Sequence, residues 1–184
     1  MEDKFYWHCL NLIPEIGPQR FKKLYTFFET MKEAWQADFG LLLKTGLEEK
    51  IIEKIFSLKK EINTEKEIEN LEKEGIKILT IKEKNYPFRL KEIYNPPALL
   101  YLKGNFETKD NDFSLAVVGT RKASSYGKQI TLEIVRELAQ KGLTIVSGLA
   151  YGIDSFAHQE TINIKGRTIA VLGCGLSEKV IYLK

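Results

Sequence analysis

Three short clusters of small and polar residues, each directly after an apolar run, carry residue types that bind phosphate. They are Gly119-Thr120-Arg121 after Leu115–Val118, Ser147-Gly148 after Leu143–Val146, and Gly173-Cys174-Gly175 after Thr168–Leu172. A glycine lets a phosphate approach the backbone, a threonine hydroxyl can donate a hydrogen bond, and an arginine can clamp a phosphate with two charge-assisted bonds. Taken alone, the first cluster is equally compatible with a turn glycine beside a surface arginine.

The segment after Gly148 adds an aromatic residue and a possible acid–base pair. Tyr151 can stack on a nucleic-acid base or pack on the edge of a sheet. Asp154 suits the first turn of a helix, and His158 lies four residues further on, where the two can hydrogen-bond. Together with Ser147 they suggest a hydrolase triad, but the nucleophile signature GxSxG is absent and the residues lie on one short segment. We therefore expect structural roles for the pair.

The elements that position these residues form an alternating pattern. Helical segments separate the three apolar runs, so the sequence predicts strand, helix, strand, helix, strand, with buried parallel strands. Because the carboxyl ends of parallel strands meet at one edge of a sheet, we expect the three clusters to line that edge. The dinucleotide signature GxGxxG and the Walker motif are both absent, which argues against an ordinary nicotinamide enzyme and a nucleotide-hydrolysing motor.

The charge distribution favours an anionic partner for the same region. The net charge is only +3, but residues 111–184 hold nine Lys or Arg and six Asp or Glu, while residues 1–110 hold 19 of each. Within this region Lys122, Lys128 and Arg167 are weaker electrostatic candidates beside Arg121. A solvated surface with scattered lysines explains the same excess equally well.

The amino-terminal part reads as a small all-helical domain. Apolar residues at helical spacing predict helices near Phe5–Leu12, after Pro18, and over Leu47–Ile62. The turn Ile13–Gly17 is similar to a DNA-binding helix-hairpin-helix, but the carboxylate of Glu15 would repel phosphate, so a packing or protein-contact role is the better prediction.

The next segment carries further elements of the sheet. Thr64 and Glu67 form a capping box for a helix that ends near Gly75. We expect the strands that follow, Ile76–Ile81 and Ala98–Leu102, to extend the parallel sheet. The predicted domains are therefore residues 1–62, helical, and residues 63–184, α/β with a mostly parallel sheet.

Composition excludes several classes of protein. No apolar run approaches the roughly 20 residues that a membrane helix needs, and the amino terminus lacks a signal-peptide pattern, so we expect a cytoplasmic chain. Cys9 and Cys174 are too few for a disulfide framework and lack the spacing of a zinc site. We predict no metal and no cofactor.

Several ordered motifs resemble those of the DprA/Smf family, the DNA-processing proteins of bacterial natural transformation. They are VVGTRKASSYGKQ, IVSGLAYGIDSFAHQ, GRTIAVLGCGL and the preceding NYPFRLKEIYNPPALLYLKGN. The helical amino terminus is similar to the family's sterile-alpha-motif-like domain, so the resemblance covers nearly the whole chain.

The resemblance implies an extended Rossmann-like fold that dimerises. It also implies a non-enzymatic binder of single-stranded DNA that protects incoming DNA and helps to load the RecA recombinase. By motif match, Arg121 is the principal phosphate ligand, and Gly119, Thr120, Ser147 and Gly148 shape the pocket. Family members continue past the GCGL motif with further elements, whereas this chain stops at Lys184, so we expect an incomplete sheet.

Two other functions stay open from the residues themselves. A nucleotide or nucleoside-phosphate enzyme would place its ligand at the same sheet edge, although the PGGxGT loop of cytokinin-activating phosphoribohydrolases is absent. The third possibility is that the chain acts mainly through its helical domain, as a module that contacts other proteins.

Overall fold

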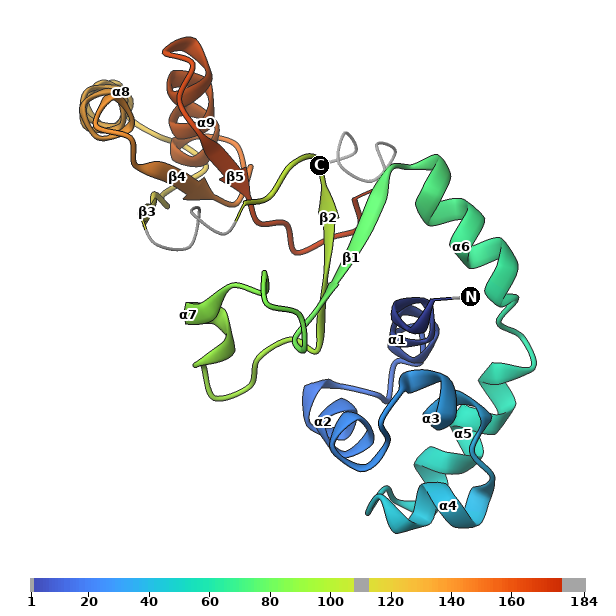
Figure 1. The fold of residues 1–184 in the computed structure, drawn as a ribbon. Coiled ribbons are helices and arrows are strands. Elements are labelled where there is room, and N and C mark those ends of the chain that lie inside the picture. Colours follow the sequence, from blue (N-terminus) through green and yellow to red (C-terminus); the bar gives the residue numbers. More distant parts are fainter. Residues whose placement is uncertain (1, 108–112, 177–184) are drawn as a thin grey trace. The chain divides into compact units, whose positions relative to one another are not determined.

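The computed structural model describes residues 2–107 and 113–176, and the segment predicted to depart from the family after Leu176 lies outside them. The chain divides into unit 1, Met1–Asn105, and unit 2, Phe106–Lys184 (Figure 1). The sequence placed the domain boundary between residues 62 and 63 instead. That boundary stays a prediction. In the structure, residues 63–105 belong to the same unit as the helices that precede them.

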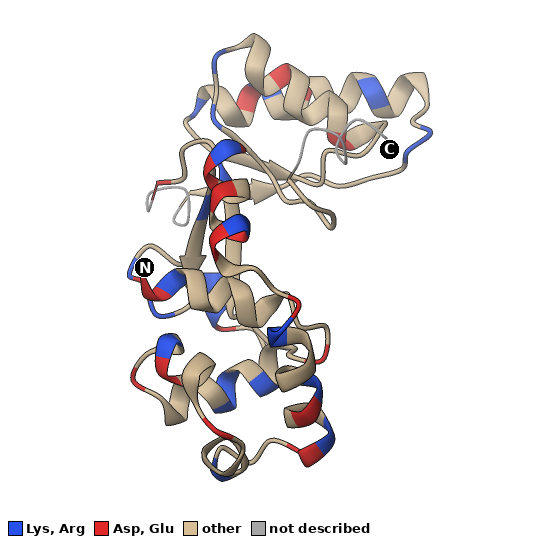
Figure 2. Ribbon diagram, turned by 90° about the vertical axis from the view of Figure 1, so that its right-hand side faces the viewer, with Lys and Arg blue, Asp and Glu red and all other residues tan. Residues whose placement is uncertain are grey.

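Unit 1 begins with six helices that enclose an apolar core. They are α1 (Asp3–Asn11), α2 (Pro18–Phe27), α3 (Met31–Gln36), α4 (Phe39–Lys44), α5 (Glu49–Lys59) and α6 (Thr64–Lys73). Trp7 stacks on Phe21 with ring centroids 5.3 Å apart, and both rings are buried. Pro18 opens α2 as predicted, because a proline at the first helical position loses no hydrogen bond. Acidic and basic residues are interspersed along the helices (Figure 2).

Two details of the helices differ from the prediction. The helices α3 and α4 were not predicted, because each has only six residues and shows too little periodicity. The cap of α6 is Asn63, whose side chain accepts from the Lys66 amide, instead of Thr64. Asparagine and threonine both cap helices, so the sequence located this start to within one residue.

A hairpin-like pair of strands completes unit 1. Strand β1 (Ile76–Thr80) pairs antiparallel with β2 (Leu99–Lys103), and the short helix α7 (Phe88–Lys91) lies in their connection. The prediction that they extend the parallel sheet is wrong for the described strands, which form two separate sheets. The two strands run antiparallel and form backbone hydrogen bonds with each other, so they pair as a sheet of their own.

A buried histidine joins the first helix to this strand pair. His8 lies with its Nδ1 2.7 Å from the Tyr101 hydroxyl, and its Nε2 lies 3.6 Å from Glu67 Oε2. Burial lowers the pKa of His8, an effect that the nearby Glu67 charge opposes. Burial also raises the pKa of the adjacent Cys9 thiol to about 11.

Unit 2 has the predicted strand–helix alternation. Its elements are β3 (Ser114–Ala116), α8 (Ser125–Gln140), β4 (Thr144–Ser147), α9 (Ile153–Asn163) and β5 (Thr168–Ala170). The strands are parallel in the order β3-β4-β5, as in a Rossmann-like sheet. Helices α8 and α9 lie on the same side of it (Figure 1). They bury the core residues Val135, Ala139, Ile145 and Ala157.

The strands of unit 2 are less buried than their apolar sequences predict. Continuous apolar runs are typical of strands covered on both faces. Leu115 in β3 is 39% exposed, however, and Val118 and Val171, just beyond the ends of β3 and β5, are 75% and 62% exposed, since α8 and α9 lie on one side of the sheet. None of the described helices is long and apolar enough to cross a membrane. No three His, Cys, Asp or Glu side chains within the described ranges gather closely enough to hold a metal ion.

Candidate functional site

The parallel register brings the loops after all three strands to one edge of the sheet. Ala116 pairs with Val146, and Val146 pairs with Ile169, so the strands end nearly level. The clusters at 119–121, 147–148 and 173–175 therefore follow the carboxyl ends of adjacent strands. The prediction is confirmed for 119–121 and 147–148, which both bond to the start of α9, and it stays a prediction for 173–175.

The start of α9 holds the first loop in place. Ile153 donates its amide to the Thr120 carbonyl over 3.2 Å. Gly152 has a φ of 84°, and a Cβ there would lie 2.2 Å from the Thr120 carbonyl oxygen. A Cβ on Gly119 would lie 2.5 Å from the Ile153 side chain. Both glycines are therefore required by close packing, and the 119–121 backbone has a fixed position against the helix.

This fixed loop presents two cations to solvent. Thr120 Oγ1 accepts from the Lys122 amide over 3.2 Å, a short turn that closes the loop on itself. The side chains of Arg121 and Lys122 are exposed, and neither makes an ion pair within residues 2–107 and 113–176. An arginine without an acidic partner on a rigid loop keeps its hydrogen-bond donors available for a phosphate.

The second loop shapes the edge and offers few donors of its own. Ser147 is buried, and its hydroxyl donates to the Val117 carbonyl over 2.6 Å. Gly148 donates its amide to Asp154 Oδ2 over 3.1 Å, and a Cβ on Gly148 would lie 2.9 Å from that oxygen. Ser147 thus connects β4 to the loop after β3, and Gly148 connects it to α9; their role in shaping a pocket stays a prediction.

The first turn of α9 therefore positions both loops. Ile153 contacts the loop after β3, and the next residue, Asp154, accepts from the loop after β4. Sequence reasoning assigned Asp154 to the helix dipole and passed over Gly152 and Ile153. A glycine just before a predicted helix start was the available signal, since glycine there often marks a close backbone approach.

The expected Asp154–His158 hydrogen bond is replaced by another. His158 Nδ1 lies 2.7 Å from Thr168 Oγ1, and that hydroxyl donates to the Ile145 carbonyl over 2.9 Å. Since the hydroxyl has one proton, it accepts from His158, which places the imidazole proton on Nδ1. Burial lowers the pKa of His158, opposed by the Asp154 charge. Ser147 donates to Val117, Asp154 accepts from Gly148 and His158 donates to Thr168, so each of these side chains bonds to another part of the fold.

Three further side chains of this edge are exposed or partly covered. Lys128, in the first turn of α8, places its Nζ 5.1 Å from the centre of the Phe156 ring. Tyr151 is 69% exposed, and Tyr126, also in the first turn of α8, is 73% exposed. Sequence reasoning missed Tyr126, although an aromatic residue close after a basic loop was a visible signal.

Arg167 is separated from the other candidates. It directly precedes β5, and its carbonyl accepts from the Ile145 amide, so it lies toward the amino edge of the parallel sheet. Arg121 follows β3 and lies at the carboxyl edge. A residue before a parallel strand and one after it lie at opposite edges, so the structure groups Arg121, Lys122 and Lys128 without Arg167.

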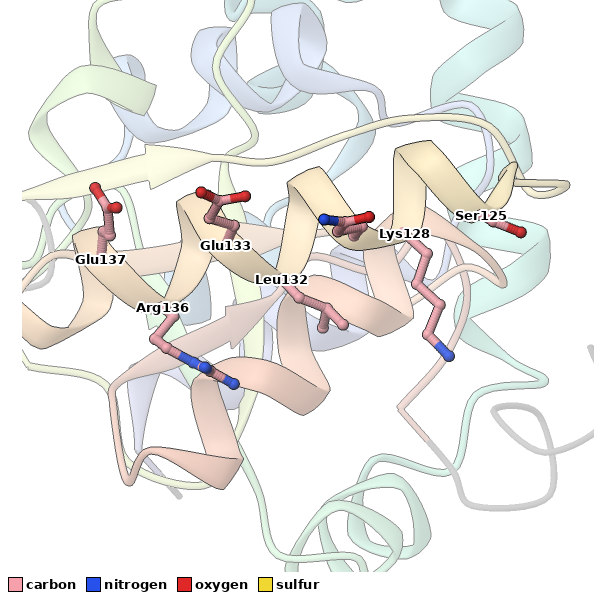
Figure 3. Close-up of a pocket in the computed structure, with 7 residues that line it drawn as sticks. Ser125, Lys128, Leu132, Glu133, Arg136 and Glu137 are labelled. Carbon is pink, nitrogen blue, oxygen red and sulfur yellow. The ribbon is translucent and has the colours of Figure 1, made fainter.

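A depression along α8 extends from Lys128 away from this edge. It has a volume of about 620 Å³ and is lined by Ser125, Lys128, Gln129, Leu132, Glu133, Arg136 and Glu137. Lys128 and Arg136 point to one side of the helix, and Glu133 and Glu137 to the other (Figure 3). Arg136 pairs with the buried Glu160 over 2.6 Å, so it stabilises the contact between α8 and α9. The mixed charge makes this surface a poor anion site.

Comparison with known proteins agrees with the fold and the motifs. The family model for DNA recombination-mediator protein A matches residues 77–182. The chain is 35% identical over 178 residues to Protein Smf of Synechocystis sp., covering 95% of this chain and 45% of that protein. It is 45% identical over 102 residues to the DNA processing protein DprA of Bacillus subtilis, covering 55% of this chain and 34% of that protein.

The structural comparison extends over both units. The X-ray structure of DNA processing protein A from Streptococcus pneumoniae matches with a TM-score of 0.70 at 27% identity, covering 98% of this chain and 63% of that one. The chain spans less than half the length of the Synechocystis and Bacillus subtilis relatives. The fold and the site define a Rossmann-like α/β protein with a helical amino-terminal part and a basic loop edge. The chain belongs to the DprA/Smf family.

Proposed function

We propose that the chain binds single-stranded DNA along the carboxyl edge of the β3–β5 sheet, with Arg121 as its principal phosphate ligand. The observation that carries this proposal is the exposed guanidinium of Arg121, which has no ion-pair partner among the described residues and lies on a loop that α9 holds in place. Lys122 and Lys128 add positive charge at the same edge. The nearby acid Asp154 is buried and accepts from Gly148, which limits its repulsion of a phosphate.

The exposed aromatic residues favour a single strand over a duplex. Tyr126 and Tyr151 stand in or beside the first turns of α8 and α9, close in sequence to the basic loops. Unpaired bases can stack on such rings, and each stacking contact contributes about 1–3 kcal/mol. Duplex DNA keeps its bases stacked on one another and has no face to offer. The relatives' names, which describe DNA processing, support the same class of ligand.

The proposal is for binding without catalysis. Ser147, Asp154 and His158 donate to or accept from backbone and threonine groups of the fold, which supports structural roles for them. Incubation with nucleoside monophosphates tests this directly. We expect no release of free base, and base release that Arg121→Gln abolishes would overturn the proposal in favour of a nucleoside-phosphate enzyme.

The wider role that we propose is recombination mediation in the cytoplasm. The name of the matching family describes mediators of recombination. On this proposal the protein forms a homodimer, protects incoming DNA and helps RecA to assemble on it during natural transformation. Sedimentation analysis tests the dimer. RecA assembly on an oligonucleotide coated by a single-strand-binding protein, measured with and without this chain, tests the loading step.

A titration with a labelled oligothymidylate tests the binding site. Arg121→Gln removes the proposed phosphate ligand, and Lys141→Gln is the matched control, because it removes one exposed charge next to the amino end of β4. We expect Arg121→Gln to weaken binding and to reduce the slope of log affinity against log salt by about 0.7, the contribution of one single-strand phosphate. Equal slopes for both variants would contradict the assignment.

A further inference from the structure

The connection between β1 and β2, residues 81–98, is a long loop that is fixed at its base. We call it the 81–98 loop. The Ile81 amide donates to the Ala98 carbonyl over 2.9 Å, and the buried Tyr86 donates its hydroxyl to the Pro97 carbonyl over 2.7 Å. Burial raises the pKa of Tyr86 to about 12, so this donor keeps its proton at neutral pH. The loop therefore has an ordered base from which its outer residues project (Figure 1).

Three large apolar side chains of this loop are exposed. Tyr94 is 95% exposed, Phe88 is 66% exposed, and Ile93 is 48% exposed. Tyr94 makes no hydrogen bond or ring contact with the described residues. Single exposed apolar residues are common, but a group of them on an anchored loop marks an interaction surface.

The same loop carries cations that the described chain does not neutralise. Lys84, Arg89 and Lys91 are exposed and make no ion pair within the described residues, and Glu92 is the one acid of the loop left unpaired there. Glu83 instead accepts from the Thr80 amide over 2.7 Å. Exposed rings among unpaired cations match the chemistry of single-stranded nucleic acid, whose bases stack while its phosphates attract positive charge.

We propose that the 81–98 loop is a second contact surface for single-stranded nucleic acid. Tyr94 and Phe88 provide stacking faces for bases, and Lys84, Arg89 and Lys91 attract the phosphates. The inference rests on the proposed function for its class of ligand, but its residues belong to unit 1, whereas Arg121 belongs to unit 2. An acidic apolar protein segment would also suit exposed rings and cations. The loop holds four cations against the two acids Glu83 and Glu92, and Tyr94 is 95% exposed, which together favour the nucleic acid.

Substitution of the exposed rings tests the stacking role. With a labelled oligothymidylate as the probe, we expect Tyr94→Ala to lower affinity by roughly 5- to 150-fold and Tyr94→Phe to retain it. Phe27→Ala is the control, because this ring is 45% exposed but lies on α2, outside the loop. Because Tyr94 is almost fully exposed, its truncation leaves the fold intact, and the fluorescence of the unit 1 tryptophans checks this.

Substitution of the cations tests the phosphate role. Replacing Lys84, Arg89 and Lys91 together by Gln reduces the salt slope by about 2, since each single-strand phosphate contributes about 0.7. Lys50→Gln on α5 is the charge control and leaves the slope unchanged. A photoreactive oligothymidylate adds a direct readout, with a crosslink expected on the peptide that contains Tyr94.

The outcomes separate this inference from the proposed function. If Arg121→Gln weakens binding while Tyr94→Ala and the triple variant bind as wild type does, the loop inference is overturned and the proposed function stands. If the loop variants weaken binding and Arg121→Gln does not, the loop inference is supported and the Arg121 assignment fails. Absence of oligothymidylate binding by the wild-type chain would overturn both. A second crosslinking experiment places the photoreactive group on the protein, at position 94. If that group crosslinks to protein and not to the oligothymidylate in the mixture, the inference is overturned as well.

Discussion

Substitution of Gly152 by alanine tests whether the start of α9 fixes the phosphate-binding loop. Gly152 has a φ of 84° and a ψ of −127°, a conformation that is essentially restricted to glycine. An alanine Cβ would lie 2.2 Å from the Thr120 carbonyl oxygen and 2.7 Å from the Arg121 carbonyl oxygen. Both neighbours are backbone atoms, so no side chain can rotate away. The loop and the helix must separate.

The cost has two parts. A non-glycine residue in this backbone region costs about 1–3 kcal/mol. Separation also lengthens the hydrogen bond from the Ile153 amide to Thr120, which contributes about 1 kcal/mol. We therefore expect Gly152→Ala to lower the free energy of unfolding of unit 2 by about 2–4 kcal/mol. Gly142→Ala is the matched control, because Gly142 has a φ of 87° but a Cβ there would have no neighbour within 4 Å. Its expected cost is about 1–2 kcal/mol.

The positions of the tryptophans make the assay specific to one unit. The chain has two tryptophans, Trp7 and Trp35, and both belong to unit 1. In urea, tryptophan fluorescence follows unit 1, while the hydrogen exchange of α9 amides follows unit 2. We expect Gly152→Ala to leave the fluorescence transition unchanged and to raise α9 exchange far more than Gly142→Ala does. Equal effects of the two variants would refute the proposed contact between α9 and Thr120.

Three further predictions follow from buried polar groups. Asp154→Ala leaves the part-buried Gly148 amide without its acceptor and should destabilise unit 2 by about 1–3 kcal/mol in urea titrations, whereas Asp154→Asn retains an acceptor oxygen and should cost less. Burial lowers the pKa of His8 and His158 from 6.5, so the folded chain binds fewer protons than the unfolded chain and stability falls as the pH drops through the window below 6.5. These are the only histidines, and a double His→Gln variant should lose this dependence in thermal scans at pH 5–7. Because burial raises the pKa of the Cys9 thiol to about 11, native alkylation should modify Cys174 first, and equal rates in a mass-spectrometric time course would argue against a buried Cys9.

The parallel strands and the shared edge of unit 2 were predictable because local signals agreed. Each apolar run ended at glycine or serine, and each was separated from the next by a helix-length segment. Arg167 was also open to correction from the sequence, because a residue before a strand lies toward the amino edge. The prediction grouped it by charge and overlooked its position.

Other features depend on packing that one sequence does not encode locally. The sequence predicted strands at 76–81 and 98–102 but gave no signal that they pair with each other instead of joining the parallel sheet. The hydrogen-bond partners of Ser147, Gly148 and His158 are Val117, Asp154 and Thr168. These groups come close only once the helices have packed on the sheet. The hydrogen bond from the Tyr86 hydroxyl to Pro97 likewise joins residues that are 11 positions apart, which a local pattern does not show.

Hydrogen exchange of the full chain with and without an oligothymidylate tests the central claim most directly. If DNA lies across the carboxyl edge of the β3–β5 sheet, amides in 119–124 and 149–152 should gain protection on binding. Amides at the amino edge, in 141–143 and 165–167, should not change, and Arg121→Gln should reduce the protection. Protection confined to the amino edge, or equal at both edges, would contradict the account.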